Sequence, residues 1–142
     1  YYSFTGIGGD CTNFASQCLY AGAGVMNHTR VYGWYYIDAG RRSASWTGVK
    51  YFRNFVVSNM LAGPFGRECW RGELSPGDFV QLAGPGEVYY HTLVVVRTGE
   101  SPQDLLVAAH TDDSDDRPLS TYRYHSARFL KIEGVRRPAI QE

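Results

Sequence analysis

A chain of 142 residues, of which 44% are hydrophobic, is long enough to bury a core as one domain, 1–142, without disulfides or metals. Fourteen Lys plus Arg balance fourteen Asp plus Glu, so no net positive field gathers nucleic acid or an anionic membrane. No stretch approaches the roughly 18 apolar residues of a membrane-spanning helix, and we expect neither nucleic acid nor membrane as partner.

The first predicted element is an amphipathic helix from Asp10 to about Ala21. Its apolar residues recur with the spacing of one helix face, at Cys11, Phe14, Ala15, Cys18 and Leu19. Asp10 is a suitable N-cap, and glycines follow where the pattern stops, as they do at many helix C-termini. The chain opens with tyrosine rather than methionine, which we interpret as a processed product or an excised domain.

Residues 25–42 are rich in glycine and aromatic residues and show no persistent period, so we expect irregular structure that covers the core or lines a cleft. A second helix is predicted from Ser45 to Met60. Ser45 or Thr47 is its candidate cap, and the Gly-Pro pair at 63–64 ends it.

The second half of the chain is rich in predicted strands. A Pro-Gly-Asp turn precedes a short apolar strand at 79–82, and further strands are predicted at about 88–97, 105–110 and 122–132. Helices followed by strands indicate an α+β fold, with N-terminal helices packed on a C-terminal antiparallel sheet.

Cys11 stands in the first turn of the first predicted helix. Unpaired backbone N–H groups and the positive end of the helix dipole favour a thiolate there over a thiol. Cys11 is therefore a candidate nucleophile, although its place on the apolar stripe equally suits a small buried residue. Cys18 is assigned to packing and Cys69 to a loop, and one disulfide among the three cysteines remains open.

Two predicted strands offer a base for this nucleophile. If the strands at 88–97 and 105–110 form a hairpin, His91 can lie directly opposite His110, with Cβ atoms about 5 Å apart on one face. Asp112 would share that face if the strand continues, whereas a slip of one residue would move a histidine to the other face. For either histidine alone we favour a structural role, but together they make His91 the candidate base and leave His110 and Asp112 as candidates to orient it.

The acidic segment 112–116 carries carboxylates at alternate positions, which are ligands that calcium accepts. It lacks the glycine and the terminal glutamate of an EF-hand loop, and the chain has no zinc-type spacing of His or Cys. We interpret the segment as a solvated loop and expect no functional metal.

Five motifs then point to a family. They are Gly8-Gly9-Asp10-Cys11-Thr12-Asn13-Phe14, Ser45-Trp46-Thr47-Gly48-Val49, Leu74-Ser75-Pro76-Gly77-Asp78, Tyr90-His91-Thr92 and Ala109-His110-Thr111-Asp112-Asp113. In this order, over nearly the whole chain, they resemble the bacterial putative amidase domain family. That family is similar to the NlpC-type and CHAP cell-wall hydrolases, which resemble papain in placing a helix-borne cysteine before a strand-borne histidine. The resemblance implies a papain-like, NlpC-type fold.

The resemblance also implies a mechanism. Cys11 is the expected nucleophile of a cysteine-dependent amide hydrolase, His91 its base and His110 the third residue, with Asp112 as runner-up. A thioester acyl-enzyme is expected, and no cofactor. The implied substrate is a peptide or peptidoglycan, and we expect a monomer that is extracellular or associated with the cell wall.

Aromatic residues are the candidates for substrate contacts. An aromatic-rich cleft of Trp34, Tyr35, Tyr36 and Trp46 could pack against a peptide or glycan, or these residues could belong to the core. In NlpC-type enzymes a tyrosine upstream of the nucleophile contributes to the oxyanion site, and the resemblance offers Tyr2, or its neighbour Tyr1, for that place.

Two other functions remain open at this stage. A non-catalytic, aromatic-lined module would bind glycan or peptide with a vestigial cysteine and histidine. A thiol acyltransferase would form the same acyl-enzyme and pass the acyl group to an amine instead of water. Selective alkylation of Cys11 would favour both enzymes over the module.

Overall fold

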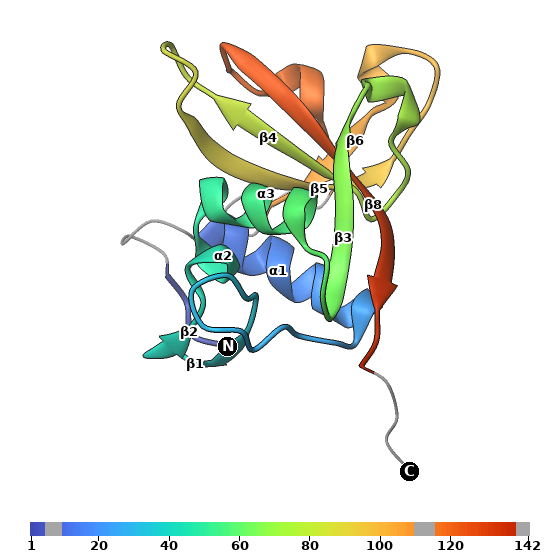
Figure 1. Ribbon diagram of the computed structural model, residues 1–142. Coiled ribbons are helices and arrows are strands. Elements are labelled where there is room, and N and C mark those ends of the chain that lie inside the picture. The colour runs from blue at the N-terminus through green and yellow to red at the C-terminus, as the bar shows by residue number, and fades with distance from the viewer. Residues whose placement is uncertain (5–9, 110–115, 139–142) are drawn as a thin grey trace.

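The structure, a computed structural model, describes residues 1–4, 10–109 and 116–138. Within these ranges the α-helices are α1 (Asp10–Ala23), α2 (Ala44–Thr47) and α3 (Val49–Ser58), shown in Figure 1. The first predicted helix is confirmed. None of the described helices is long and apolar enough to cross a membrane.

The second predicted helix is in fact two, because Gly48 separates α2 from α3. Its φ of −104° and ψ of 126° are extended rather than helical. Glycine has a low helix propensity, and a Cβ at this position would lie 2.9 Å from the carbonyl oxygen of Ala44. Ser43, not Ser45 or Thr47, occupies the N-cap position of α2.

The described strands form one six-stranded antiparallel sheet with the spatial order β3-β8-β4-β5-β6-β7. Its strands are β3 (Gly63–Cys69), β4 (Phe79–Ala83), β5 (Tyr89–Arg97), β6 (Leu106–Ala108), β7 (Arg117–Pro118) and β8 (Ser126–Arg136). A separate two-stranded sheet joins β1 (Tyr36–Asp38) to β2 (Arg41–Arg42). Helices packed on an antiparallel sheet confirm the predicted α+β class.

Strand β3 is a correction to the sequence analysis. The Gly-Pro pair at 63–64 begins this strand, and Cys69, predicted to lie in a loop, pairs with Phe129 of β8. The residues of β3 do not alternate between apolar and polar, so the strand depends on its long partner rather than on a local pattern. Proline is tolerated here because β3 is an edge strand.

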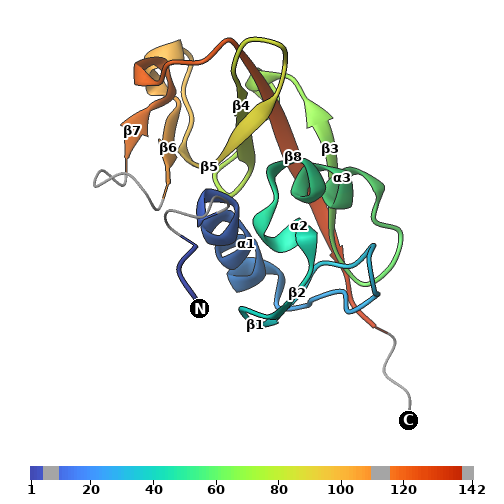
Figure 2. The ribbon, with the colours of Figure 1, turned by 90° about the vertical axis from the view of Figure 1, so that its left-hand side faces the viewer.

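Both faces of the sheet are covered. Figures 1 and 2 place the three helices on the same side of it, where they pack on β3, β5 and β8. The helix-facing core consists of Ala15, Leu19, Trp34, Trp46, Phe52, Phe55, Val56, Phe79 and Leu130. The far-face core consists of Leu74, Val80, Leu82, Leu93, Val95, Leu105, Val107, Ala109 and Leu119.

The predicted register of β5 and β6 is wrong by one residue. The prediction pairs Val94 with Val107, whereas the structure pairs Val94 with Ala108 and Val95 with Val107. An irregularity between Val95 and Arg97 shifts the ladder, and this kind of local insertion leaves no mark in an apolar run. The geometric argument that set His91 opposite a second histidine therefore fails for the described strands.

His110 and Asp112 themselves lie outside the described residues. Their roles therefore stay predictions, and these predictions rest on the family motif rather than on hairpin geometry.

Candidate active site

Cys11 lies in the first turn of α1, where this helix packs against β5. Its side chain is buried, with 8% of its surface exposed. The Sγ atom lies 4.0 Å from the carbonyl oxygen of Tyr90, the residue that directly precedes His91. The structure thus brings the candidate nucleophile to the strand that carries the candidate base.

A β-bulge marks this point of β5. Leu82 of β4 pairs with His91 and Ala83 pairs with Tyr89, so Tyr90 is the extra residue of the bulged strand. Bulges redirect side chains and recur beside active sites. Here the bulge leaves the Tyr90 side chain half exposed while its carbonyl group faces Cys11.

The imidazole of His91 lies between two tyrosines. Its ring centroid is 6.1 Å from that of Tyr90, with nearly parallel planes, and 6.0 Å from that of Tyr122. His91 is partly buried, and the next residue, Thr92, is fully buried and turned toward α1. Because successive side chains of a strand point to opposite faces, His91 points to the far face of the sheet, which it shares with its cross-strand partner Leu82.

The residues on either side of Cys11 fix the start of α1 to other elements. The Asp10 carboxylate accepts a hydrogen bond from the backbone N–H of Phe4 at 2.9 Å. The Asn13 side chain donates to the carbonyl oxygen of Tyr2 at 3.0 Å and accepts from the Trp46 indole at 3.0 Å. The Asp-Cys-Thr-Asn run therefore acts as an anchor for the N-terminal segment and for α2.

Two of the predicted substrate contacts are wrong. Trp34 and Trp46 have no exposed surface and belong to the helix-facing core, with ring centroids 4.7 Å apart. Each indole N–H has a buried partner, the hydroxyl of Ser16 for Trp34 and the side-chain oxygen of Asn13 for Trp46. Because these N–H groups are satisfied, both rings can be buried completely.

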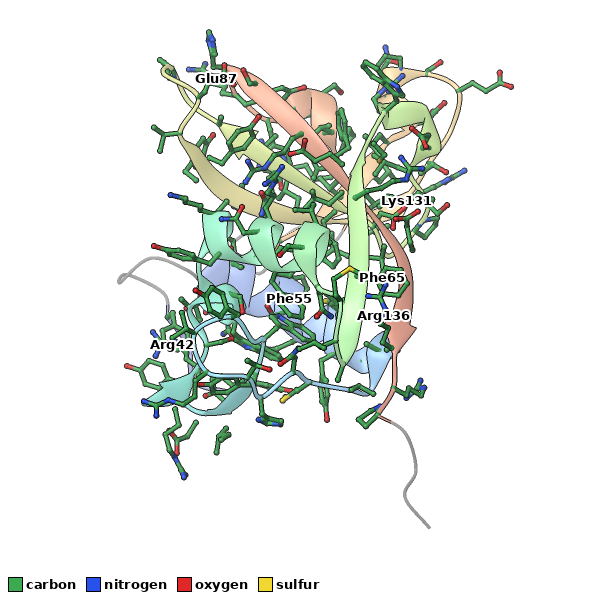
Figure 3. All side chains as sticks on the ribbon, viewed as in Figure 1. Arg42, Phe55, Phe65, Glu87, Lys131 and Arg136 are labelled. Carbon is green, nitrogen blue, oxygen red and sulfur yellow. The ribbon has the colours of Figure 1, made fainter. Side chains whose placement is uncertain are left out.

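Tyr2 and Tyr35 are accessible to a ligand. Tyr2 is 53% exposed, and its backbone is bonded to Asn13 in the helix that carries Cys11. Tyr35 lines a cavity of about 740 Å³ between residues 31–35, residues 42–45 and α3. Figure 3 labels Arg42 and Phe55, which belong to the lining of this cavity.

Arg42 connects this cavity to the start of α1. It is the charged residue of the cavity lining, and its guanidinium lies 4.4 Å from the centre of the Phe4 ring. Phe4 is in turn bonded to Asp10, the residue before Cys11. A second, open cavity of about 400 Å³ is lined by Tyr90, Arg123 and Tyr124 and lies directly beside the bulge.

All three cysteines are free, so the open alternative of a disulfide does not occur in this structure. Burial raises the pKa of the Cys18 thiol. Burial, followed by the negative charges of Glu73 and Asp78, raises the pKa of the Cys69 thiol. Both environments disfavour a thiolate, which makes Cys18 and Cys69 suitable controls for Cys11.

No group of three His, Cys, Asp or Glu side chains within the described ranges could hold a metal ion. Most of the acidic segment 112–116 lies outside these ranges. The solvated loop without a functional metal therefore stays a prediction.

Sequence reasoning missed the bulge and the two tyrosines beside His91. Tyr90 belongs to the Tyr-His-Thr motif, but nothing in the sequence around it distinguishes a bulged residue from a regular strand residue. Tyr122 comes from a segment far along the chain, and only the folded sheet brings it to His91.

Residues 1–132 match the family described as "Putative amidase domain". A relative, the "Uncharacterized protein YhbB" of Bacillus subtilis (strain 168), is 38% identical over 111 residues, which are 74% of this chain and 34% of that protein. This chain thus spans about a third of that relative's length. No solved structure matches, so the papain-like part of the predicted fold stays a prediction. The chain belongs to the putative amidase domain family, whose name describes hydrolysis of amide bonds in general.

Proposed function

We propose that this chain hydrolyses an amide bond with Cys11 as nucleophile and His91 as general base. The observation that carries the proposal is the position of the Cys11 Sγ atom. It lies at the N-terminus of a helix and 4.0 Å from the backbone of the bulge that carries His91. A helix N-terminus supports a thiolate, and the imidazole carried by the strand that contacts Cys11 is the base that we propose for it.

In the proposed reaction, His91 takes the proton of the Cys11 thiol, and the thiolate attacks the carbonyl carbon of the amide. Backbone N–H groups at the start of α1 stabilise the oxyanion that forms. The intermediate collapses as the His91 imidazolium gives its proton to the leaving amine, and a thioester remains on Cys11. His91 then takes a proton from water, which attacks the thioester and releases the carboxylic acid and the thiolate.

A third residue would orient His91 in this mechanism. His110 is our assignment, and Asp112 is the alternative. Both are supported by the resemblance of the Ala-His-Thr-Asp-Asp motif to the third position of NlpC-type enzymes, and the same resemblance supports a papain-like fold.

The proposed substrate is a peptide or peptidoglycan amide, and no cofactor takes part. The open cavity beside Tyr90 provides space for the groups that flank the scissile bond. The cavity lined by Tyr35 is suited to a more distant part of the substrate, because its tyrosine rings and Arg42 offer apolar faces and one positive charge. Such a substrate places the protein outside the cell or at the cell wall, and we propose that it acts as a monomer.

The test is a comparison of three cysteine variants on purified peptidoglycan and on soluble stem peptides. Cys11→Ala should abolish the release of new amino groups, whereas Cys18→Ala and Cys69→Ala should retain it. All three variants should keep the circular dichroism spectrum of the parent chain. A Cys11→Ala variant that still hydrolyses the substrate would refute the proposed nucleophile.

A further inference from the structure

A chain of hydrogen bonds runs through the protein interior from Arg128 to Cys11. The Arg128 Nε–H group donates to the Gln81 side-chain oxygen at 2.7 Å, and the Gln81 amide donates to the Thr92 hydroxyl at 3.1 Å. The hydroxyls of Thr92 and Thr12 lie 3.0 Å apart, and the Thr12 hydroxyl lies 3.8 Å from the Cys11 Sγ atom. The three middle residues have no exposed surface.

The direction of these hydrogen bonds follows from the donors available. Arg128 has only N–H donors, so the Gln81 oxygen must face it, and the Gln81 NH2 group then donates to the Val49 carbonyl oxygen and to Thr92. Thr92 therefore accepts from Gln81. Its own hydrogen has one partner left, the Thr12 oxygen.

The Thr12 hydroxyl is then an acceptor from Thr92, and its hydrogen is available to the Cys11 sulfur. The opposite direction would leave the Thr92 hydrogen without an acceptor in a fully buried environment, which costs free energy. Every donor in the chain thus points toward the sulfur, and the chain begins at a permanently positive group.

We propose that Thr12, Thr92, Gln81 and Arg128 form a polarised relay that stabilises the Cys11 thiolate and fixes its position against β5. Hydrogen bonds in a row strengthen one another in a buried environment, so the last hydroxyl donates more strongly than an isolated one. The guanidinium of Arg128 lies 3.8 Å from the centre of the Tyr89 ring, and no carboxylate of the described chain forms an ion pair with it. Its charge is therefore not neutralised by such a pair.

These are positioning residues, because only the Thr12 hydroxyl approaches the sulfur. A role of these residues in catalysis rests on the proposed function. Their effect on the reactivity of the Cys11 sulfur does not depend on that function. An experiment can therefore refute the relay without refuting the proposed amide hydrolysis, and the reverse.

The experiment measures the rate at which iodoacetamide alkylates Cys11 at neutral pH, with peptide mapping of the adduct. The thiolate displaces iodide, so the rate reports the reactive anion. Thr92→Val removes the hydroxyl but keeps the volume, and it should lower the rate several-fold, because the Thr12 hydroxyl keeps its contact with the sulfur but loses the donor that polarises it. Thr92→Ser keeps the hydroxyl and should restore most of the rate.

A double variant separates a relay from independent structural effects. Gln81→Met should lower the alkylation rate in the parent chain but should have little further effect in Thr92→Val, where the chain is already broken. A relay thus predicts non-additive losses, whereas separate packing defects predict losses that multiply. The melting temperature of each variant shows whether it is folded, and if Thr92→Val does not fold, Gln81→Met and Thr92→Ser carry the test.

Parent-like alkylation in folded Thr92→Val, or in folded Gln81→Met, would overturn the relay, and so would multiplicative losses in the double variant. Amide hydrolysis is measured on the same samples. A slowed alkylation in Thr92→Val supports the relay even if the parent chain hydrolyses no amide, an outcome that would refute the proposed function alone.

Discussion

The two cores of this protein differ in chemistry although they share one sheet. The buried members of the far-face core are all aliphatic. The helix-facing core is rich in aromatic residues and lies beside fully buried polar side chains, among them Thr12, Ser16, Gln81 and Thr92. Strand β4 shows the difference within three residues, because Val80 and Leu82 belong to the far-face core while Gln81 bonds to α3 and β5.

This difference shows which interactions stabilise the sheet and which fix the position of Cys11. Buried polar groups cost free energy unless each has a partner, and none of the buried side-chain N or O atoms of the described residues lacks one. These bonds hold the start of α1 in one place against β5, and Cys11 lies there. The far-face core stabilises the sheet through apolar burial, and its member Leu82 pairs with His91 beside the bulge.

The largest expected effect is a loss of kcat on replacement of the candidate base, His91. His91→Ala should lower kcat for amide hydrolysis about 10²–10⁴-fold, the range of general acid–base catalysis, with little change in melting temperature. His28→Ala is the matched control for kcat, since His28 is exposed and its ring stacks on Tyr35 rather than on the bulge of β5. Equal losses in both variants would remove His91 from the mechanism.

The next effect concerns the residue that orients His91. His110→Ala should lower kcat by orders of magnitude with a small change in KM, and Asp112→Ala should be mild. The opposite order of the two losses would assign the third position to the Asp112 carboxylate. Moderate losses that are not additive in the double variant would indicate that both residues act as one unit with His91.

The far-face core should affect stability alone. Leu105→Ala removes a buried side chain of this core and should lower the free energy of unfolding by about 2–5 kcal/mol. The alkylation rate of Cys11 should stay close to that of the parent chain at temperatures where the variant is folded. A large loss of Cys11 reactivity in folded Leu105→Ala would mean that the two regions are not separable.

The smallest effect is expected far from the scissile bond. Tyr35→Ala should raise KM several-fold and leave kcat nearly unchanged, since Tyr35 lines the cavity that is connected to α1 through Arg42 and Phe4. Tyr35→Phe keeps the ring and should behave like the parent chain. A KM that does not respond to Tyr35→Ala would exclude this cavity as part of the substrate site.

The sequence predicted those features that depend on local patterns. The helix from Asp10 follows from its apolar stripe and its cap, and β4 and β5 follow from apolar runs bounded by turn residues. The position of Cys11 in the first turn follows from the same helix boundary.

Other features depend on contacts between distant segments and could not be read from local patterns. The one-residue shift between β5 and β6 arises from an irregularity that apolar runs do not encode. The complete burial of Trp34 depends on Ser16, a residue of α1 whose hydroxyl accepts a hydrogen bond from the Trp34 indole. Strand β3 forms because β8 extends far enough to pair with all of it.

The most direct test of the central claim is to trap the acyl-enzyme. The parent chain is mixed with a stem-peptide substrate, quenched in acid within the first turnovers and analysed by intact-protein and peptide mass spectrometry. The account predicts a mass increase equal to the acyl part of the substrate, located on the peptide that contains Cys11 and removed by hydroxylamine. Steady amide hydrolysis with no acyl group on Cys11 at any quench time, or with the acyl group on Cys18 or Cys69, would contradict it.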